Sequence, residues 1–380
     1  MTEEINQDGG KMKELKLINS GSYGCIYRPT LTCNGNVGST KYITKIQKNK
    51  RSIMNELYIS KKIRNIVGYV RFFAPILKSC DVKIAKDRVR DLKKCEVFEN
   101  VPEQQIEGST YISMKTRYVG DKDLKKYIFS NLNSSGFLHE LWRTHIHLLK
   151  GIQHLFKHRI VHYDLKYNNV MFDDARNEPI IIDFGQSVLI DDLKTEDQLS
   201  AAFFVFDQYD YWCIDILICS YIFHKIGYKD AMIEKVTEHG IDHIYDVFIH
   251  GTEHTGNAKK VVSSAYLYNI LQNPSKMNNF ETVFKEYARQ FINVRTWWEF
   301  YEELVKNANT WDCYSLSVIY LNMLDDLFLY NPESYRNMVT FSNMRLPKYV
   351  ELMESIIYSI PGKRPSVQMV INELERIAKM

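Results

Sequence analysis

The segment that decides the fold reads Ile160-Val161-His162-Tyr163-Asp164-Leu165-Lys166-Tyr167-Asn168-Asn169-Val170. Asp164 can accept or orient the proton of an attacking hydroxyl, and Asn169 can bind a Mg²⁺ ion while it steadies the loop by a hydrogen bond. Lys166 can neutralise charge on a phosphoryl group in transit. Apolar periodicity predicts a helix over residues 137–157, and β-type patterns predict strands over 170–172 and 179–182. The polar loop between helix and hairpin therefore has the side chains of a phosphoryl-transfer site.

A second polar group follows the hairpin in Ile180-Ile181-Ile182-Asp183-Phe184-Gly185. The apolar run predicts a buried strand that delivers the Asp183 carboxylate at its end, and Gly185 allows the chain to turn there. A carboxylate in this position suits a metal ion that bridges the β- and γ-phosphates of a nucleotide. An aspartate at a strand end without such a role is the alternative.

Near the N-terminus, residues 15–27 alternate apolar and polar side chains around a glycine-containing turn, which predicts a hairpin. Gly21 and Gly24 would let backbone amides approach phosphate oxygens, and Ile18 and Ile26 would cover an adenine ring. Asn19 stands where a first glycine is usual, and asparagine tolerates positive φ better than most residues. The predicted nucleotide-binding segment is Ile18, Asn19, Ser20, Gly21, Ser22, Tyr23, Gly24, Cys25 and Ile26. An ordinary hairpin turn is the alternative.

The next predicted strand, 42–46, carries Lys45 between apolar residues, which suits a lysine that reaches the α- and β-phosphates. Such a lysine needs a carboxylate to hold it, and Glu56 on a helix predicted over 53–66 is the candidate. The spacing of eleven residues implies a short connection between strand and helix. A solvated lysine and a surface glutamate are the alternatives.

In this order the motifs resemble the eukaryotic-type protein kinase family: glycine-rich loop, strand lysine, helix glutamate, H-x-D-L-K-x-x-N loop and D-F-G. The resemblance implies an α+β, two-lobed protein-kinase-like fold, with a mainly β N-lobe and a larger mainly α C-lobe. The expected boundaries are a leader over 1–12, the N-lobe over 13–116 and the C-lobe over 117–380. The resemblance also implies ATP with Mg²⁺ (or Mn²⁺), and Ser/Thr hydroxyls of proteins as acceptors, because Lys166 resembles the lysine of the Ser/Thr branch.

The C-terminal half departs from the family's pattern. Two segments could supply the long helix at the centre of the C-lobe, one around Asp210 and one around Asp312. In the family, an Arg-Pro pair follows this helix within a few dozen residues, so the segment around Asp312, which Arg364-Pro365 follows, fits better. This choice implies an inserted helical block over about 216–308. The family's A-P-E motif is absent, and Asp215 is the predicted substitute partner of Arg364.

The family's arginine before the catalytic aspartate is Tyr163 here. That arginine normally pairs with a phosphate on the activation loop, and a tyrosine cannot make this charged, bidentate contact. We therefore expect activity without phosphorylation of Ser187, Thr195 or Ser200. The insertion, the absent A-P-E motif and the segment Thr296-Trp297-Trp298 resemble kinases encoded and packaged by large DNA viruses.

The composition sets the outer limits. The chain has 380 residues, 45% of them hydrophobic, and its 49 Lys+Arg and 46 Asp+Glu give a net charge of +3. This balance gives no sign of a strongly basic surface that would bind nucleic acid, and no sign of a disordered acidic tail. The charged interruptions in residues 201–223 argue against a membrane span. Seven scattered cysteines, without a C-x-x-C pair, predict no disulfide framework and favour a reducing compartment, the cytoplasm or, for a viral enzyme, also the virion.

Two other functions stay open. A non-catalytic relative could bind ATP or a partner as a scaffold, and Asn19, Tyr163 and the short connection before Glu56 favour it. A small-molecule phosphotransferase could share the fold, although such enzymes usually lack a complete D-F-G and this glycine-rich loop. The sequence leaves the protein substrate and the oligomeric state undetermined.

Overall fold

The computed structural model describes residues 15–21, 24–47, 50–84, 86, 89–130, 137–251, 274–342 and 344–380. The chain divides into two compact units. The N-terminal unit comprises the chain up to Val67 together with Ala74–Val119, and the C-terminal unit comprises Gly68–Phe73 and Gly120–Met380. The expected lobe boundary after residue 116 differs from this division by three residues and by the segment 68–73. The expected leader, 1–12, lies outside the described residues.

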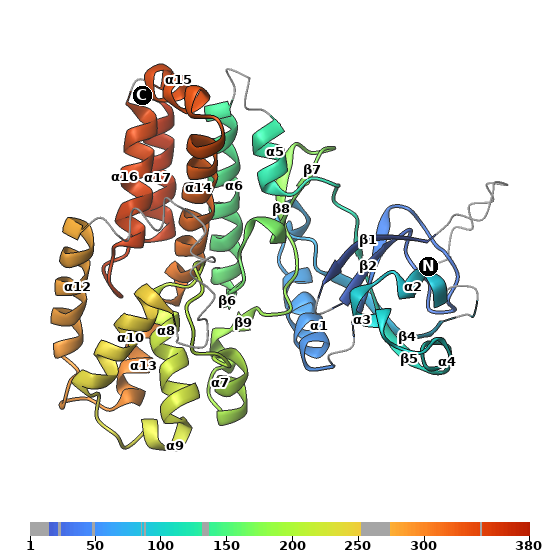
Figure 1. Cartoon of the computed structure of the whole chain (residues 1–380), viewed down its shortest axis with the longest axis horizontal. Helices are drawn as coiled ribbons and strands as arrows, with labels where there is room; N and C mark the ends of the chain where they lie inside the picture. The colour runs from blue at the N-terminus through green and yellow to red at the C-terminus, as the bar shows by residue number, and fades with distance from the viewer. Residues whose placement is uncertain are drawn as a thin grey trace. The chain divides into compact units, whose positions relative to one another are not determined.

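The N-terminal unit is built on a five-stranded antiparallel sheet in the order β1-β2-β3-β5-β4 (Figure 1). Strands β1 and β2 form the hairpin predicted for residues 15–27, and helix α1 follows β3 and packs against β4. The elements are β1 Lys16–Gly21, β2 Gly24–Arg28, β3 Tyr42–Gln47, α1 Lys50–Arg64, β4 Ile76–Lys83 and β5 Thr110–Arg117.

The charged composition of residues 86–108 predicts a loop or an irregular hairpin, and this prediction is wrong. These residues contain three short helices, α2 Val89–Lys93, α3 Glu96–Glu99 and α4 Glu103–Gly108. The side chains of Leu92, Phe98 and Ile106 are buried in one cluster with residues of the sheet. These apolar residues follow no helical repeat, because each helix has fewer than two full turns, and a periodicity test therefore misses them.

The prediction that the cysteines stay unpaired is wrong in the N-terminal unit. Cys25 of β2 is bonded to Cys95 just before α3, and Cys33 is bonded to Cys80 of β4. The Cα atoms of the two pairs are 6.0 and 5.8 Å apart, within the usual range for disulfides. The partners are 70 and 47 residues apart in sequence, so only the fold brings them together. The inference of a reducing compartment, which rested on unpaired cysteines, loses its basis.

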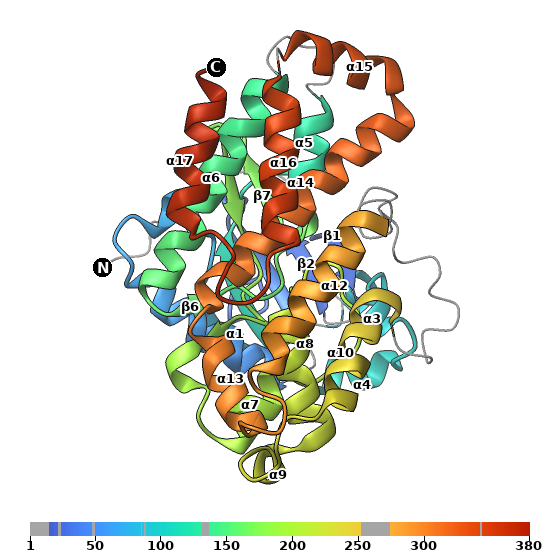
Figure 2. The ribbon, with the colours of Figure 1, turned by 90° about the vertical axis from the view of Figure 1, so that its left-hand side faces the viewer.

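The core of the C-terminal unit is a group of long helices. Helix α6, Phe137–Lys157, has the bounds predicted from its periodicity and buries one apolar face. It packs against α14, Trp311–Tyr330, and α17, Val367–Ala378, while α16, Arg345–Ile357, packs against both of these partners. Figures 1 and 2 show these four helices side by side. They form the support on which the loop after α6 rests.

Two small strand pairs lie beside α6. Strands β7, Val170–Asp173, and β8, Glu178–Ile181, form the hairpin predicted after the polar loop. Strand β6, Ile160–Val161, pairs with β9, Val188–Leu189, and so connects the start of the polar loop to the segment after Gly185.

The remaining elements of the C-terminal unit are short helices and turns. Residues 216–308, where described, are mainly helical as expected, and α8 contacts both α10 and α13. Helices α12 and α13 are the later helices of this block. The bounds are α5 Leu124–Ser130, α7 Glu196–Ala202, α8 Ile214–Tyr221, a π-helical turn Ile222–Ile226, α9 Tyr228–Ala231, α10 Glu238–His250, α12 Pro274–Arg289, α13 Trp297–Val305 and α15 Pro332–Phe341, with 3₁₀ turns at Tyr69–Arg71, Tyr167–Asn169, Ile190–Asp192 and Ala308–Thr310. Within the described ranges, no helix is both long enough and apolar enough to cross a bilayer.

Candidate active site

The β1–β2 hairpin carries the residues predicted to lie over a nucleotide. Asn19 pairs with Ile26 across the hairpin, next to a register shift between Leu17 and Asn19. Asn19 is thus a strand residue. It does not have the positive φ that is expected from its position in place of the usual first glycine. Ser22 and Tyr23, at the tip, lie outside the described residues. Ile18 is 41% exposed, so its side chain is available to a ligand.

Three other residues of the hairpin attach it to its surroundings. A Cβ at Gly24 would lie 2.6 Å from Cγ of Gln47, so this glycine is required for the close approach of β2 to β3. The Ser20 hydroxyl accepts a hydrogen bond from the backbone N–H of Glu96 at 2.9 Å. The disulfide of Cys25 joins the same part of the hairpin to the residue before α3. The hairpin is therefore fixed along its length by contacts within the N-terminal unit.

Lys45 and Glu56 form a buried ion pair in the N-terminal unit. The Nζ atom of Lys45 lies 2.9 Å from Oε2 of Glu56, and their side chains are 11% and 3% exposed. The short spacing is possible because β3 ends at Gln47 and α1 begins at Lys50. The alternatives of a solvated lysine and a surface glutamate do not describe this pair. Its low exposure makes the position of the ammonium group well defined.

In the C-terminal unit, a buried aspartate of α14 anchors the polar loop. The carboxylate of Asp312 accepts hydrogen bonds from the backbone N–H groups of His162 at 2.7 Å and Tyr163 at 3.0 Å. Burial raises the pKa of Asp312, while His162 and these two donors act in the opposite direction. Tyr163 has φ of 70°, an unusual value for a bulky residue, and Trp212 also holds it by donating to its carbonyl at 2.9 Å. Asp312 thus fixes the turn that presents Asp164.

The side chain of Asp164 is the centre of a hydrogen-bond cluster. Lys166 Nζ lies 3.1 Å from Oδ1 and 2.9 Å from Oδ2 of Asp164. The Asn169 amide donates to Oδ2 at 3.0 Å and to the Asp164 backbone carbonyl at 2.8 Å. The structure thus brings together the three loop residues that the sequence singled out, and it fixes both carboxylate oxygens.

One member of this cluster, Tyr209, does not follow from the sequence motifs; its hydroxyl donates to Asp164 Oδ1 at 2.9 Å. Tyr209 lies between α7 and α8, 45 residues after Asp164, in a segment without a recognisable motif. Burial raises the pKa of Tyr209 far above its ordinary value, and the neighbouring Asp164 carboxylate raises it further. The hydroxyl therefore stays protonated and remains a donor. The dense run of aromatic and acidic residues from Phe206 to Trp212 is the signal that could have indicated a functional segment.

Asp183 follows strand β8 and is joined to the polar loop through its neighbours. The backbone N–H of Ile182 donates to the Asn169 carbonyl at 2.9 Å, and His162 Nε2 donates to the Ile182 carbonyl at 3.0 Å. The buried Phe184 packs on the rings of His162, at 5.1 Å between centroids, and Phe73, at 6.1 Å. Asp183 itself has φ of 60°, so its backbone conformation is unusual for a residue with a side chain.

Asn169 and Asp183 fit the ligand requirements of Mg²⁺. Both N–H···O contacts recorded for the Asn169 amide go to Asp164, which leaves the amide oxygen for a cation. Mg²⁺ usually takes one or two protein ligands and completes its octahedron with water and phosphate oxygens. Among the described residues, no group of three or more His, Cys, Asp or Glu side chains is placed to hold a metal ion.

The predicted pair of Asp215 and Arg364 is confirmed as a buried ion pair. Arg364 Nη2 lies 2.9 Å from Asp215 Oδ2, and the two side chains are 1% and 0% exposed. Arg364 Nη1 also donates to the Thr310 hydroxyl at 2.9 Å. Burial alone would lower the pKa of Arg364, but Asp215 raises it, so the guanidinium stays charged. The pair joins α8 to the segment before α17.

Tyr163 lies among aromatic rings. Its ring centroid is 5.1 Å from that of Trp212, 6.2 Å from that of Phe203 and 6.4 Å from that of Trp311. Phe203 follows α7, and Trp212 precedes α8. This aromatic cluster, Tyr163, Phe203, Trp212 and Trp311, therefore fixes both ends of the segment 203–212 without any charged contact.

A comparison with protein families agrees with this geometry. The model of the family described as protein kinase domain matches residues 12–374. The match includes both compact units, from the β1–β2 hairpin to the greater part of α17.

Proposed function

The chain belongs to the protein kinase domain family, and we propose that it transfers the γ-phosphate of MgATP to Ser or Thr hydroxyls of protein substrates. The observation that carries the proposal is the Asp164 cluster. The buried Asp312 anchors the loop that presents the Asp164 carboxylate, the Lys166 ammonium group lies beside it, and the Asn169 amide donates to one of its oxygens. Such a carboxylate can orient an alcohol and take its proton.

Each named residue has a task in this reaction. Lys45, held by Glu56, would contact the α- and β-phosphates of ATP. Asn169 and Asp183 would hold Mg²⁺, which when bound neutralises charge on the phosphate oxygens. Asp164 would orient the acceptor hydroxyl, and Lys166 would stabilise the negative charge of the transferred group. The hairpin residues 18–26 would cover the nucleotide.

The preference for Ser and Thr rests on Lys166, two positions after Asp164, where its ammonium group contacts both carboxylate oxygens. The resemblance to kinases of large DNA viruses is also part of the proposal, and it rests on the block 216–308, the absent A-P-E motif and the segment Thr296-Trp297-Trp298.

The test is phosphate transfer from radiolabelled MgATP to a generic basic protein by wild type and by Asp164→Asn. Loss of a general base typically lowers the rate about 10²–10⁴-fold. Asp174→Asn is the matched control, because Asp174 is exposed in the β7–β8 turn. Equal, background-level transfer by wild type and D164N would favour the scaffold function instead. Label found on sugars or choline but not on protein would favour a small-molecule phosphotransferase.

A second test addresses nucleotide binding through Lys45. Replacing Lys45 by Met removes the ammonium group, and we expect transfer to fall by at least about 10²-fold because fixed charge at the phosphates is lost. Lys150→Met is the matched control, since Lys150 is half-exposed and pairs with the half-exposed Glu375. An unchanged rate in K45M would remove Lys45 from the proposed mechanism.

A further inference from the structure

The carboxylate of Asp164 is fully occupied by donors from its own chain. Oδ1 receives Lys166 Nζ at 3.1 Å and the Tyr209 hydroxyl at 2.9 Å, and Oδ2 receives Lys166 Nζ at 2.9 Å and the Asn169 amide at 3.0 Å. A carboxylate offers about four lone-pair sites for hydrogen bonds. Four contacts therefore fill its capacity. An additional hydroxyl can bind only if one of these donors leaves.

The three donors differ in how firmly they are tied to Asp164. Lys166 contacts both oxygens, and Asn169 also donates to the Asp164 backbone carbonyl, so displacing either disturbs the loop itself. Tyr209 makes a single hydrogen bond to Asp164, through its hydroxyl, and it comes from a separate segment between α7 and α8. It is also the only donor of the four contacts that is a hydroxyl, the same chemical group as a protein acceptor.

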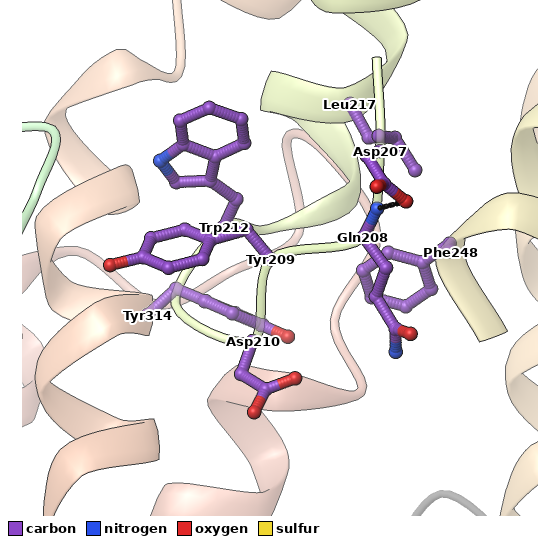
Figure 3. A pocket seen from close by; sticks show the side chains of 8 residues that line it. All are labelled: Asp207, Gln208, Tyr209, Asp210, Trp212, Leu217, Phe248 and Tyr314. Atoms are coloured by element: carbon purple, nitrogen blue, oxygen red, sulfur yellow. Dashed lines mark hydrogen bonds between the residues drawn. The ribbon is translucent and has the colours of Figure 1, made fainter. Parts of the chain in front are cut away.

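The surroundings of Tyr209 hold the phenol in this position. Its ring lies 5.2 Å from the ring of Trp212 and 5.3 Å from that of Tyr211, both edge-on. Figure 3 shows the ring beside Trp212, with its hydroxyl turned away from Asp207, Gln208 and Phe248, the residues at the far side of the small pocket. Within this segment Asp210 is partly buried, and burial raises its pKa to about 6. The phenol is thus held by its ring and is directed to Asp164 by its hydroxyl.

We propose that the Tyr209 hydroxyl occupies the acceptor-hydroxyl position on Asp164, and that an incoming protein hydroxyl displaces it before phosphate transfer. This inference rests on the proposed kinase function, because it assigns the acceptor position to Asp164. Tyr209 is then a specificity-determining residue: an acceptor reaches Asp164 only if the rest of its binding energy outweighs this internal hydrogen bond. Water, which brings no such energy, is kept from the carboxylate.

The variant Tyr209→Phe separates this function from a purely structural one. Phenylalanine keeps the ring contacts with Trp212 and Tyr211 and removes only the hydroxyl. Loss of one competing hydrogen bond should lower the KM for a protein acceptor about five- to tenfold, with kcat unchanged or raised. ATP hydrolysis without any acceptor should rise by a similar factor, since water gains access to Asp164. A positioning role would give the opposite, a lower kcat with KM unchanged.

The experiment measures both rates for wild type, Y209F, Y211F and D164N, with dephosphorylated casein as acceptor and saturating MgATP. Tyr211→Phe is the matched control: it removes a hydroxyl from the same segment that is not bonded to Asp164, and its KM should equal that of wild type. Thermal unfolding of all variants checks that the fold is kept. A lower kcat in Y209F, or a KM equal to that of wild type, overturns the inference and leaves the kinase function standing. Background rates in all four proteins overturn both, whereas an inert wild type with an active Y209F supports the inference.

Discussion

The two compact units hold their functional residues by different chemistry. In the N-terminal unit, four cysteines form two disulfides, and one of them joins β2, a strand of the predicted nucleotide-binding hairpin, to the residue before α3. In the C-terminal unit, Cys213, Cys219 and Cys313 are buried free thiols, and hydrogen bonds to the buried carboxylates of Asp312 and Asp215 fix the site.

Histidine shows the opposite distribution. All 11 histidines lie between His139 and His254, so none belongs to the N-terminal unit. A small sheet with short helices has a limited core, and covalent links compensate for it. Both units bury an ion pair, Lys45–Glu56 in the first and Asp215–Arg364 in the second, but only the larger helical unit buries histidines, such as His145 and His162. The first unit should therefore respond to reductant, and the second to acid.

The largest effect is expected where the C-terminal unit depends on its buried charge pair. Arg364→Met leaves the Asp215 carboxylate buried without its partner, which should lower the free energy of unfolding by about 3–5 kcal/mol. The measurement is urea unfolding followed by circular dichroism. Arg376→Met is the matched control, because Arg376 is an exposed residue paired with Glu373, and it should change stability by less than about 0.5 kcal/mol. If Arg364→Met and Arg376→Met lowered the free energy of unfolding by similar amounts, burial of the ion pair would not explain the loss.

The second-largest loss of stability is expected in the N-terminal unit. Replacing Cys25 and Cys95 together by Ala removes the disulfide of 70-residue separation and should cost about 2–4 kcal/mol. The measurement is chemical unfolding with and without reductant. Wild type should lose stability in reductant, and the double variant should lose less, because only the Cys33–Cys80 bond remains. Cys213→Ala is the control, since that thiol is free and its variant should keep the wild-type response. A wild type that is insensitive to reductant would contradict the comparison.

Acid should act on the C-terminal unit through His145. This histidine is fully buried on α6, bonded to the Tyr349 hydroxyl at 2.8 Å and stacked on Tyr320 at 4.0 Å. Burial lowers its pKa from 6.5 to about 3, so the folded state keeps it neutral while the unfolded state takes up a proton below pH 6.5. Stability is therefore lost as the pH falls from about 6.5 towards 3, by about 2 kcal/mol at pH 5.

Unfolding measured between pH 8 and 5 checks this acid response. His145→Gln should flatten the pH dependence, whereas His139→Gln should leave it unchanged because His139 is exposed. A pH dependence that survives in H145Q would assign the effect to other buried groups, of which His147, with its pKa lowered to about 4 chiefly by burial, is the first to examine.

The sequence predicted those parts of the molecule whose physical cause is local. The bounds of α6 follow from its apolar period, and the cluster of Asp164, Lys166 and Asn169 lies within one six-residue loop. The pairing of Asp215 with Arg364, although distant in sequence, is predicted from the family resemblance, in which this arginine pairs with the carboxylate of the A-P-E motif that is absent here.

The features that the sequence did not predict depend on distant contacts that this resemblance does not indicate. Cys25 can remain a buried thiol or pair with any other cysteine, so only the packing of α3 against β2 decides its partner. Tyr209 reaches Asp164 because the segment after α7 returns to the polar loop, and no periodic sequence pattern predicts such a contact across 45 residues. The short helices between 89 and 108 form because their few apolar side chains find a common core in the sheet.

The smallest effect is expected from the hydroxyls between Asp183 and α8. Tyr163 takes part in an aromatic cluster rather than in a charged contact, so phosphate on this segment has no arginine to bind at that position. Ser187 is buried and donates to the His162 carbonyl at 3.1 Å, Thr195 caps α7, and Ser200 is exposed on that helix. Replacing each by Ala should leave phosphate transfer nearly unchanged, although Thr195→Ala should cost about 1 kcal/mol of stability through its lost cap. A large fall in transfer by Ser200→Ala, the variant with no structural cost, would mean that phosphorylation activates the enzyme after all.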